Sequence, residues 1–327
     1  MNRTDLAGLN VSAQGLGCMG MSEFYGPTDW DTCIETVHRA IELGVTFFDT
    51  ADIYGSGHNE VVVGRGLNGH RDQVQVATKF GIDRSGGDAA RTVRGDAGYV
   101  KRSCEASLVR LGMDVIDLYY IHRPPLNADV EETIGAMADL VAQGKVRHIG
   151  VSEFGPDLLR RAHAVHPITA VQTEYSLWTR RDVEEIAPVL RDLGIGLVPY
   201  SPLGRGFLTG TVDLAALPAN DFRAHNPRFQ GEAGDANQVI ADTVREVAAG
   251  LGVQPAQVAI AWVDAQAARL GVPVVAIPGT KRPKWLEQNV AAMDVHLDDA
   301  ALARLDPLGD LVVGERYPTV MTIRPGR

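Results

Sequence analysis

The segment VTFFDTAD (45–52) decides the fold class, because it joins an apolar run to a polar cluster within eight residues. Runs that are apolar at nearly every position are typical of parallel strands that are covered on both faces. The same pattern recurs along the chain, so we expect eight strands in all. The other seven are QGLGCMGM (14–21), VQVATKF (74–80), IDLYYIH (116–122), HIGVSEF (148–154), AVQTEYS (170–176), GLVPYSP (196–202) and VVAIPGT (274–280).

Helix-like segments separate these strands. Asp96 and Asp129 stand where helix N-caps are expected, and glycines at 44, 112, 144 and 194 follow the apolar period as helix stops. The expected helices are 29–43, 58–68, 97–111, 129–143, 156–165, 180–193, 237–251 and 255–269.

Eight strands alternating with helices predict an α/β fold with a parallel sheet that closes into a (β/α)8 TIM barrel. We expect one domain over residues 1–327, with an N-terminal hairpin and long loops, including 203–236, at the face formed by the carboxyl ends of the strands. An open doubly wound sheet is the alternative. It is disfavoured because GLGCMG (15–20) lacks the G-x-G-x-x-G spacing of that fold.

The charge and composition limit the possible partners. A formal net charge of −10 argues against nucleic acid and anionic membranes, although not against a small anionic ligand held by a local basic cluster. The three cysteines have no metal-binding or disulfide spacing. With no signal-like or membrane-spanning run, we expect a soluble, cytoplasmic protein. Whether it is a monomer or a homo-oligomer is left open.

Four polar residues stand at or just beyond the ends of consecutive predicted strands: Asp49, Tyr54, Lys79 and His122. In a barrel these positions converge at one mouth, where catalytic residues are expected. An ammonium beside a phenol lowers the pKa of the phenol, so Lys79 paired with Asp49 would make Tyr54 a general acid toward a carbonyl oxygen. His122 would orient that oxygen. None of these residues supplies hydride, so a redox cofactor is required.

Several longer segments resemble the aldo-keto reductase superfamily across almost the whole chain. They are FFDTADIYG, ATKFG, IDLYYIHR, GKVRHIGVSEF, AVQTEYSLW, VPYSPLGRGFLTG and IPGTKRPKWLEQNV. The similarity is greatest to the branch that carries SPLGRG, which contains bacterial oxidoreductases and plant alkaloid-type reductases. The resemblance implies that Asp49, Tyr54, Lys79 and His122 form a catalytic tetrad that reduces aldehydes or ketones to alcohols.

The resemblance also implies a nicotinamide cofactor. Ser152 and Gln172 would bind its carboxamide, Tyr200 would stack on its ring, and the segment SPLGRG would wrap its pyrophosphate. The basic cluster after the last strand begins a helix, where phosphate binds well, so NADPH is favoured over NADH. The full predicted set is Met19, Gly20, Ser152, Gln172, Tyr200, Ser201, Pro202, Leu203, Gly204, Arg205, Gly206, Ile277, Gly279, Thr280, Lys281, Arg282, Gln288 and Asn289.

The sequence departs from the family pattern at three places. Trp285 replaces an arginine that often binds the 2′-phosphate, Glu153 replaces an asparagine, and Pro124 with Pro125 replaces Val-Asp after the His-Arg pair. For the carbonyl substrate, we expect a pocket wall built from Met19, Met21, Phe24 and Tyr25.

Two other function classes are weighed against this one. A metal-dependent barrel hydrolase would use His122 with Asp49, Asp52 or Glu174, but such enzymes need several strand-end histidines. We therefore expect no metal. A regulatory subunit that binds the cofactor with little turnover is the second alternative, and the intact tetrad argues against it.

Overall fold

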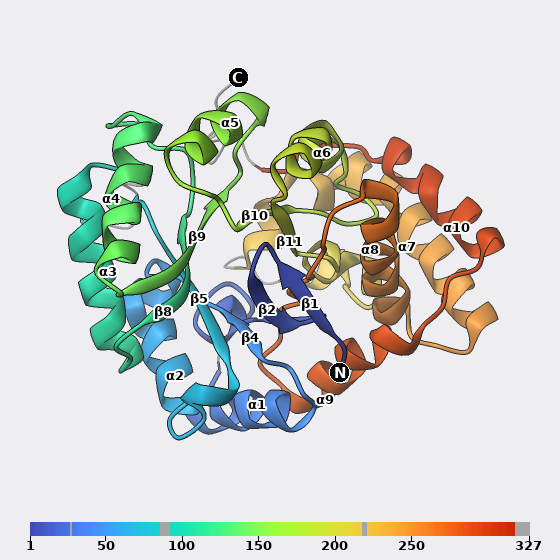
Figure 1. The fold of residues 1–327 in the computed structure, drawn as a ribbon. Coiled ribbons are helices and arrows are strands. Elements are labelled where there is room, and N and C mark those ends of the chain that lie inside the picture. Colours follow the sequence, from blue (N-terminus) through green and yellow to red (C-terminus); the bar gives the residue numbers. More distant parts are fainter. Residues whose placement is uncertain (27, 86–91, 218–220, 318–327) are drawn as a thin grey trace.

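The computed structural model describes residues 1–26, 28–85, 92–217 and 221–317. Its main sheet is parallel, and its strand order β11-β10-β9-β8-β5-β4-β3 follows the chain without a reversal (Figure 1). This order makes the doubly wound alternative wrong, since that fold reverses direction at its switch point. The strands are β3 (Leu16–Gly17), β4 (Phe47–Asp49), β5 (Gln75–Phe80), β8 (Ile116–Ile121), β9 (Val146–Ser152), β10 (Ala170–Glu174) and β11 (Gly196–Tyr200).

The segment 274–279 closes this sheet into a ring. It forms isolated bridges to both edges, Leu197 with Val274 on one side and Gly17 with Gly279 on the other. The predicted eighth strand, 274–280, is therefore present as bridging chain and not as a regular strand. Pro278 and the facing Pro199 lack an N–H group, which limits the ladder to single bonds such as Ile277 N to Pro199 O at 3.0 Å.

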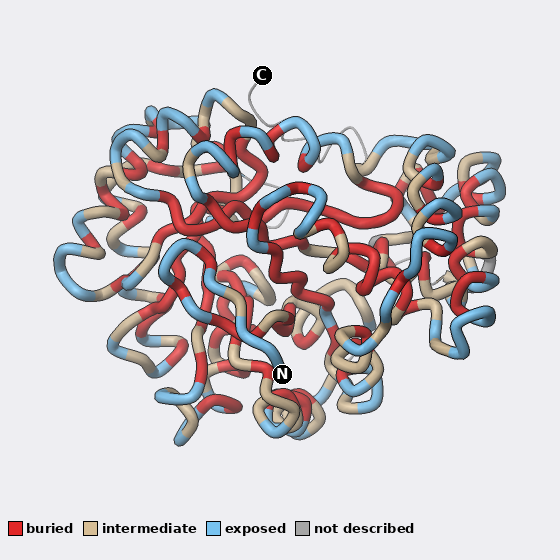
Figure 2. Tube along the Cα trace, turned by 45° about the vertical axis from the view of Figure 1, so that its right-hand side comes forward, coloured by how far each residue is buried: buried red, intermediate tan, exposed pale blue. Residues whose placement is uncertain are grey.

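Helices surround the ring of strands, and their outward turns are exposed while the strands are buried (Figures 1 and 2). They are α1 (Trp30–Glu42), α2 (His58–Gly66), α3 (Ala97–Leu111), α4 (Val130–Ala142), α5 (Pro156–Val165), α6 (Arg181–Leu193), α7 (Gly231–Leu251), α8 (Pro255–Leu270), α9 (Pro283–Val290) and α10 (Asp299–Leu305). The predicted helix 237–251 in fact begins at Gly231, within the segment expected to be a loop, and α10 was not predicted.

The predicted N-caps and glycine stops lie at helix ends, although one N-cap lacks its hydrogen bond. The Asp96 carboxylate accepts a hydrogen bond from Tyr99 N and so caps α3. Gly112 and Gly194 end α3 and α6 in the left-handed region, where glycine carries no steric penalty. Asp129 occupies the N-cap position of α4, but its side chain makes no capping hydrogen bond.

An N-terminal hairpin of β1 (Arg3–Leu6) and β2 (Leu9–Ser12) covers one end of the barrel, as predicted. Leu6 packs so closely on Gly196 of β11 that a Cβ there would lie 2.5 Å from a Leu6 methyl. Burying a leucine fully stabilises the fold by about 1.5–3 kcal/mol. The hairpin shares an interior cluster with alternate strand residues: Leu6, Leu9, Val11, Phe47, Ala77, Leu118, Tyr120, Ala170, Val198, Val275 and Ile277.

Two segments at the opposite end of the barrel differ from the prediction: one expected strand is shorter, and one expected loop contains short helices. The expected strand 14–21 ends at Gly17, and Met19–Met21 form a 3-10 helix. Short 3-10 helices also fold the chain after β11; they are η4 (Gly204–Thr209), η5 (Leu214–Ala216), η6 (Phe222–His225) and η7 (Pro227–Phe229). Within the described ranges, none of the helices is both long and apolar enough to cross a lipid bilayer.

Candidate active site

The four residues predicted to carry the chemistry come from three neighbouring strands. Asp49 is the last residue of β4, Lys79 is the fifth residue of β5, and His122 directly follows β8. Tyr54 begins the short 3-10 helix η2 (Tyr54–Gly57) that follows β4. Because β4, β5 and β8 pair in parallel, their carboxyl ends bring these side chains to the same end of the barrel.

The Lys79 ammonium is the centre of the group. Its Nζ donates to Asp49 Oδ1 at 2.5 Å, to the Thr50 carbonyl oxygen at 2.8 Å and to the Tyr54 hydroxyl at 3.4 Å. The His122 ring meets the Tyr54 ring edge-on, with centroids 5.8 Å apart. The structure therefore brings all four predicted residues together, with the lysine held by a carboxylate and aimed at the phenol.

Burial dominates the electrostatics of this group. It raises the pKa of the Tyr54 phenol above its ordinary value, and the nearby Lys79 ammonium offsets that rise only in part. The expected lowering of the phenol pKa by Lys79 is thus outweighed by burial in this structure. Burial also raises the pKa of the Asp49 carboxyl, against the pull of Lys79 and of the Gln172 amide, whose Nε2 donates to Asp49 Oδ2 at 2.8 Å.

A cleft of about 970 Å³ opens beside these residues at the carboxyl end of the barrel. Asp49, Tyr54 and His122 line it, whereas Lys79 lies behind them, fully buried. The predicted cofactor residues that line it are Met19, Gly20, Ser152, Gln172, Tyr200, Ser201, Pro202, Leu203, Arg205, Gly206, Ile277, Gly279, Thr280, Lys281, Arg282, Gln288 and Asn289.

Two predicted residues lie behind the wall of the cleft instead of in it. Gly204 backs onto the indole of Trp178, where a Cβ would lie 2.6 Å from the ring nitrogen, so the close approach explains the glycine. Met21, expected in the substrate wall, is fully buried in the main core. Met19, Phe24 and Tyr25 do line the cleft.

Two basic residues predicted to meet phosphate already have protein partners. The Arg205 guanidinium donates to the Glu174 carboxylate at 3.0 Å and is itself buried. The Lys281 ammonium donates to the carbonyl oxygens of Tyr25 and Gly26 at 2.7 and 2.8 Å. Lys281 therefore connects the loop at Tyr25 and Gly26 to the segment that follows the bridge at Gly279.

The most important feature that the sequence did not predict is an ion-pair cluster under the C-terminal tail. The Glu153 carboxylate is buried and accepts from Arg316 and, at 3.0 Å, from the Tyr200 hydroxyl. Tyr200 also meets the Tyr317 hydroxyl at 2.9 Å. Glu153 adopts a φ of 60°, which is unfavourable for any residue but glycine. The only signal in the sequence was that Glu153 departs from the family pattern.

Burial alone would raise the pKa of Glu153, but the positive charges of Arg316 and Arg123 outweigh it and lower the pKa to about 2. Arg316 also contacts Asp182 at 3.1 Å, while its carbonyl oxygen accepts from Asn226 at 2.9 Å. The cluster therefore holds the last described residues of the chain against one side of the cleft.

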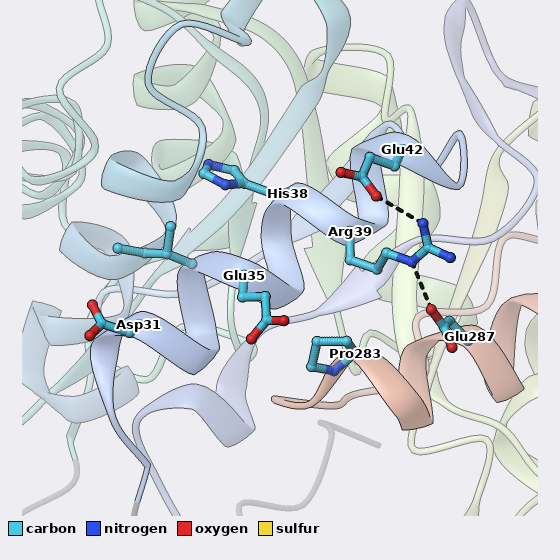
Figure 3. A pocket seen from close by; sticks show the side chains of 8 residues that line it. Asp31, Glu35, His38, Arg39, Glu42, Pro283 and Glu287 are labelled. Carbon is cyan, nitrogen blue, oxygen red and sulfur yellow. Dashed lines mark hydrogen bonds and ion pairs between the residues drawn. The ribbon is translucent and has the colours of Figure 1, made fainter.

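A second depression, of about 540 Å³, lies on the outer face between α1 and α9 (Figure 3). There Arg39 links the carboxylates of Glu42 and Glu287 at 2.8 and 2.7 Å. None of the residues predicted to carry chemistry lies in it. In the part of the chain that the structure describes, no three or more His, Cys, Asp or Glu side chains are grouped as in a metal site.

Comparisons with known proteins show the family to which this chain belongs. The family model described as "Aldo/keto reductase family" matches residues 14–310. A probable aldo-keto reductase 1 from Glycine max is 46% identical over 315 residues, which cover 95% of this chain and 90% of that protein.

Two solved structures have the same fold over nearly their full lengths. The glycerol dehydrogenase AKR11B4 from Gluconobacter oxydans superposes with a TM-score of 0.86 at 27% identity, covering 97% of this chain and 98% of that one. The holo form of aldo-keto reductase AKR11C1 from Bacillus halodurans gives a TM-score of 0.76 at 25% identity, over 98% and 99% of the two chains. This chain therefore belongs to the aldo/keto reductase family, whose members are oxidoreductases that act on small-molecule carbonyl compounds with a nicotinamide cofactor.

Proposed function

We propose that this protein reduces aldehydes or ketones to alcohols with NADPH, and that Tyr54 is the general acid. The observation that supports this most directly is the Lys79 ammonium, which donates to both Asp49 and Tyr54 while the phenol lines the open cleft. This is the arrangement that a phenol needs in order to give up a proton next to a carbonyl oxygen.

Each residue of the tetrad has a separate task in this proposal. Tyr54 donates its proton to the carbonyl oxygen as negative charge develops there. The Lys79 ammonium stabilises the phenolate that remains, and Asp49 keeps that ammonium fixed at 2.5 Å. His122, edge-on to Tyr54, donates a hydrogen bond to the same oxygen and sets its direction. The separation of 3.4 Å between Lys79 and Tyr54 is long, as is common before substrate binds.

The lining of the cleft fits a nicotinamide dinucleotide. When bound, that cofactor supplies the hydride for the carbonyl carbon. Ser152 offers a hydroxyl to its carboxamide end, and the Tyr200 ring forms a flat wall for its nicotinamide ring. Ser201 and Arg205 adopt positive φ of 51° and 58°, unfavourable conformations that often mark ligand-binding backbone. They support the assignment of 201–206 to the pyrophosphate.

The basic end of the cleft supports NADPH over NADH. Lys281 and Arg282 precede helix α9, whose N-terminal N–H groups and dipole favour an anion such as a 2′-phosphate. Because Lys281 is held by two carbonyl oxygens, we assign the larger share of the phosphate contact to Arg282. Trp285 is 44% exposed and lines the cleft near Gln288 and Asn289, where it offers a face for the adenine ring.

The three cysteines of the chain are free and buried, which supports our prediction of a reducing, cytoplasmic location.

The test is a comparison of wild type with Tyr54→Phe in two measurements. Quenching of the fluorescence of the four tryptophans during titration should give a lower Kd for NADPH than for NADH, and the same NADPH affinity for both proteins. Turnover of an aromatic aldehyde, followed by NADPH oxidation, should fall by about 10²–10⁴-fold in the variant. Wild-type turnover in Tyr54→Phe would refute the role of Tyr54, and tight NADPH binding without any turnover would favour the regulatory alternative.

A further inference from the structure

The cleft is far more basic than the protein around it. Among the residues that the structure describes, seven cationic residues and two acidic ones, Glu23 and Asp49, line it, although the whole chain has a net charge of −10. A cleft with such a lining raises the local concentration of anions. The seven cations are Arg84, Arg123, Arg205, Arg223, Lys281, Arg282 and Arg316.

Most of the arginines in this lining are already neutralised by a carboxylate. A paired guanidinium has little charge left for a ligand, because its partner occupies the donors and cancels the field. The pairs are Arg84 with Glu23 at 2.7 Å, Arg205 with Glu174 at 3.0 Å, Arg223 with Asp221 at 2.8 Å and Arg316 with Asp182 at 3.1 Å.

Arg123 differs from these four. Within the described ranges no carboxylate oxygen lies within 4 Å of its guanidinium; the Glu153 carboxylate feels the charge of Arg123 but makes its ion pair with Arg316. Its Nη1 donates to the His122 carbonyl oxygen at 2.6 Å and to Ser152 Oγ at 3.4 Å. Nε and Nη2 donate to no described group. Nε and Nη2 lie on one edge of the guanidinium, and this edge can donate two parallel hydrogen bonds to a carboxylate.

The place of Arg123 in the barrel separates it from the proposed phosphate contacts. It directly follows His122, whose ring lies against Tyr54, and it lines the same cleft as both of these residues. Arg123 lies two residues beyond the end of β8, which is the fourth strand in the ring, whereas the segment 274–279 that leads to Lys281 and Arg282 closes the ring on the far side. Arg123 is therefore available to the substrate and not to the 2′-phosphate.

We propose that Arg123 binds a carboxylate on the substrate, so that the preferred substrates are carbonyl compounds that also carry a carboxylate group. This inference rests on the proposed carbonyl reductase function. The carboxylate is unchanged in the reaction. The carbonyl carbon would accept a hydride, with its two electrons, from bound NADPH, and the oxygen would accept a proton from Tyr54, so that the products would be the hydroxy acid and NADP⁺.

The test compares two aldehydes of similar size and reactivity, 4-carboxybenzaldehyde and methyl 4-formylbenzoate. In wild type, kcat/KM should favour the acid by about 10- to 100-fold, as expected for a hydrogen-bonded ion pair. Arg123→Ala should remove this preference, chiefly through KM for the acid, and should leave the ester within about threefold of wild type. Arg123→Lys should retain part of the preference, because lysine keeps the positive charge but lacks the planar pair of N–H donors of the guanidinium.

Arg39→Ala is the matched control, because it also removes one positive charge but from the outer depression between α1 and α9. It should leave the acid-to-ester ratio unchanged. If wild type reduces both aldehydes equally, or if Arg123→Ala slows both to the same extent, Arg123 is a structural residue and the inference fails while the reductase function stands. If neither aldehyde is reduced by wild type, the proposed function itself fails.

Discussion

Two buried acid–base pairs flank the cleft, and they are built in different ways. Asp49 and Lys79 are 30 residues apart and lie on adjacent parallel strands, so the barrel itself holds them in register. Glu153 and Arg316 are 163 residues apart and join the end of β9 to the C-terminal tail. The position of the Asp49–Lys79 pair is therefore fixed by the sheet, whereas the Glu153–Arg316 pair depends on the position of the C-terminal tail, which is not part of the sheet.

The two carboxyl groups also titrate in opposite directions. Burial raises the pKa of Asp49, and one cation only partly compensates. At Glu153 the charges of Arg316 and Arg123 overcome burial and lower the pKa to about 2. The Asp49 pair holds the Lys79 ammonium beside Tyr54, while the Glu153 pair is a fastening between the tail and the barrel.

The largest effect should come from breaking the first pair. Lys79→Met leaves the Asp49 carboxylate buried with the Gln172 amide as its remaining side-chain donor. Removing one partner of a buried ion pair destabilises a protein by about 3–5 kcal/mol. Urea unfolding at pH 7 should show a loss of this order, together with loss of turnover.

A double variant distinguishes this account from simple loss of packing. Adding Asp49→Asn to Lys79→Met removes the uncompensated charge, so most of the lost free energy of unfolding should return, although activity should not. Equal stability of the single and double variants would show that the buried charge is not the cause.

Breaking the second pair should have a smaller and more local effect. After Arg316→Ala, Glu153 still accepts from Thr173 Oγ1 at 2.9 Å and from Tyr200 at 3.0 Å. We expect the tail at 311–317 to lose about 1–3 kcal/mol of protection, measured by amide hydrogen exchange, while the strands keep theirs.

Arg304→Ala is the control for this variant. Arg304 pairs with Glu246 at 2.5 Å, but both side chains are about half exposed or more, so their pair contributes little. Unchanged exchange in the tail of Arg316→Ala, or the same change in both variants, would contradict a fastening role for Glu153 and Arg316.

The sequence predicts the barrel well where its elements repeat. The strands through Asp49, Lys79 and His122, and the caps at Asp96 and Gly112, follow from local pattern and propensity. The prediction is less accurate where prolines and glycines interrupt the ladder. The bridging segment 274–279 and the early end of β3 at Gly17 depend on which backbone groups find partners across the ring, and that is a tertiary property.

The candidate site divides in the same way. Residues on strand ends, such as Asp49 and Ser152, could be predicted because the barrel fixes where they lie. The partners of charged residues could not. Neither the pairing of Arg205 with Glu174 nor that of Arg316 with Glu153 leaves a periodic signal, since each joins segments far apart in the chain. Within the predicted loop 203–236, positions 218–220 lie outside the described residues.

The smallest effect should be that of mildly acidic pH on the hydrogen-exchange protection of the tail in wild type. A carboxyl whose pKa is lowered in the folded state, from 4.5 to about 2 for Glu153, contributes stability that is fully present above the unfolded value and is lost as the pH falls toward 2. Hydrogen exchange of 311–317, corrected for the intrinsic pH dependence of exchange, should therefore be the same at pH 7 and pH 5 in wild type. Glu153→Gln should already show at both pH values the weaker protection that wild type reaches only as the pH falls to about 2. Opening of the wild-type tail with a midpoint between pH 5 and 6 would mean that another group, and not Glu153, controls the fastening.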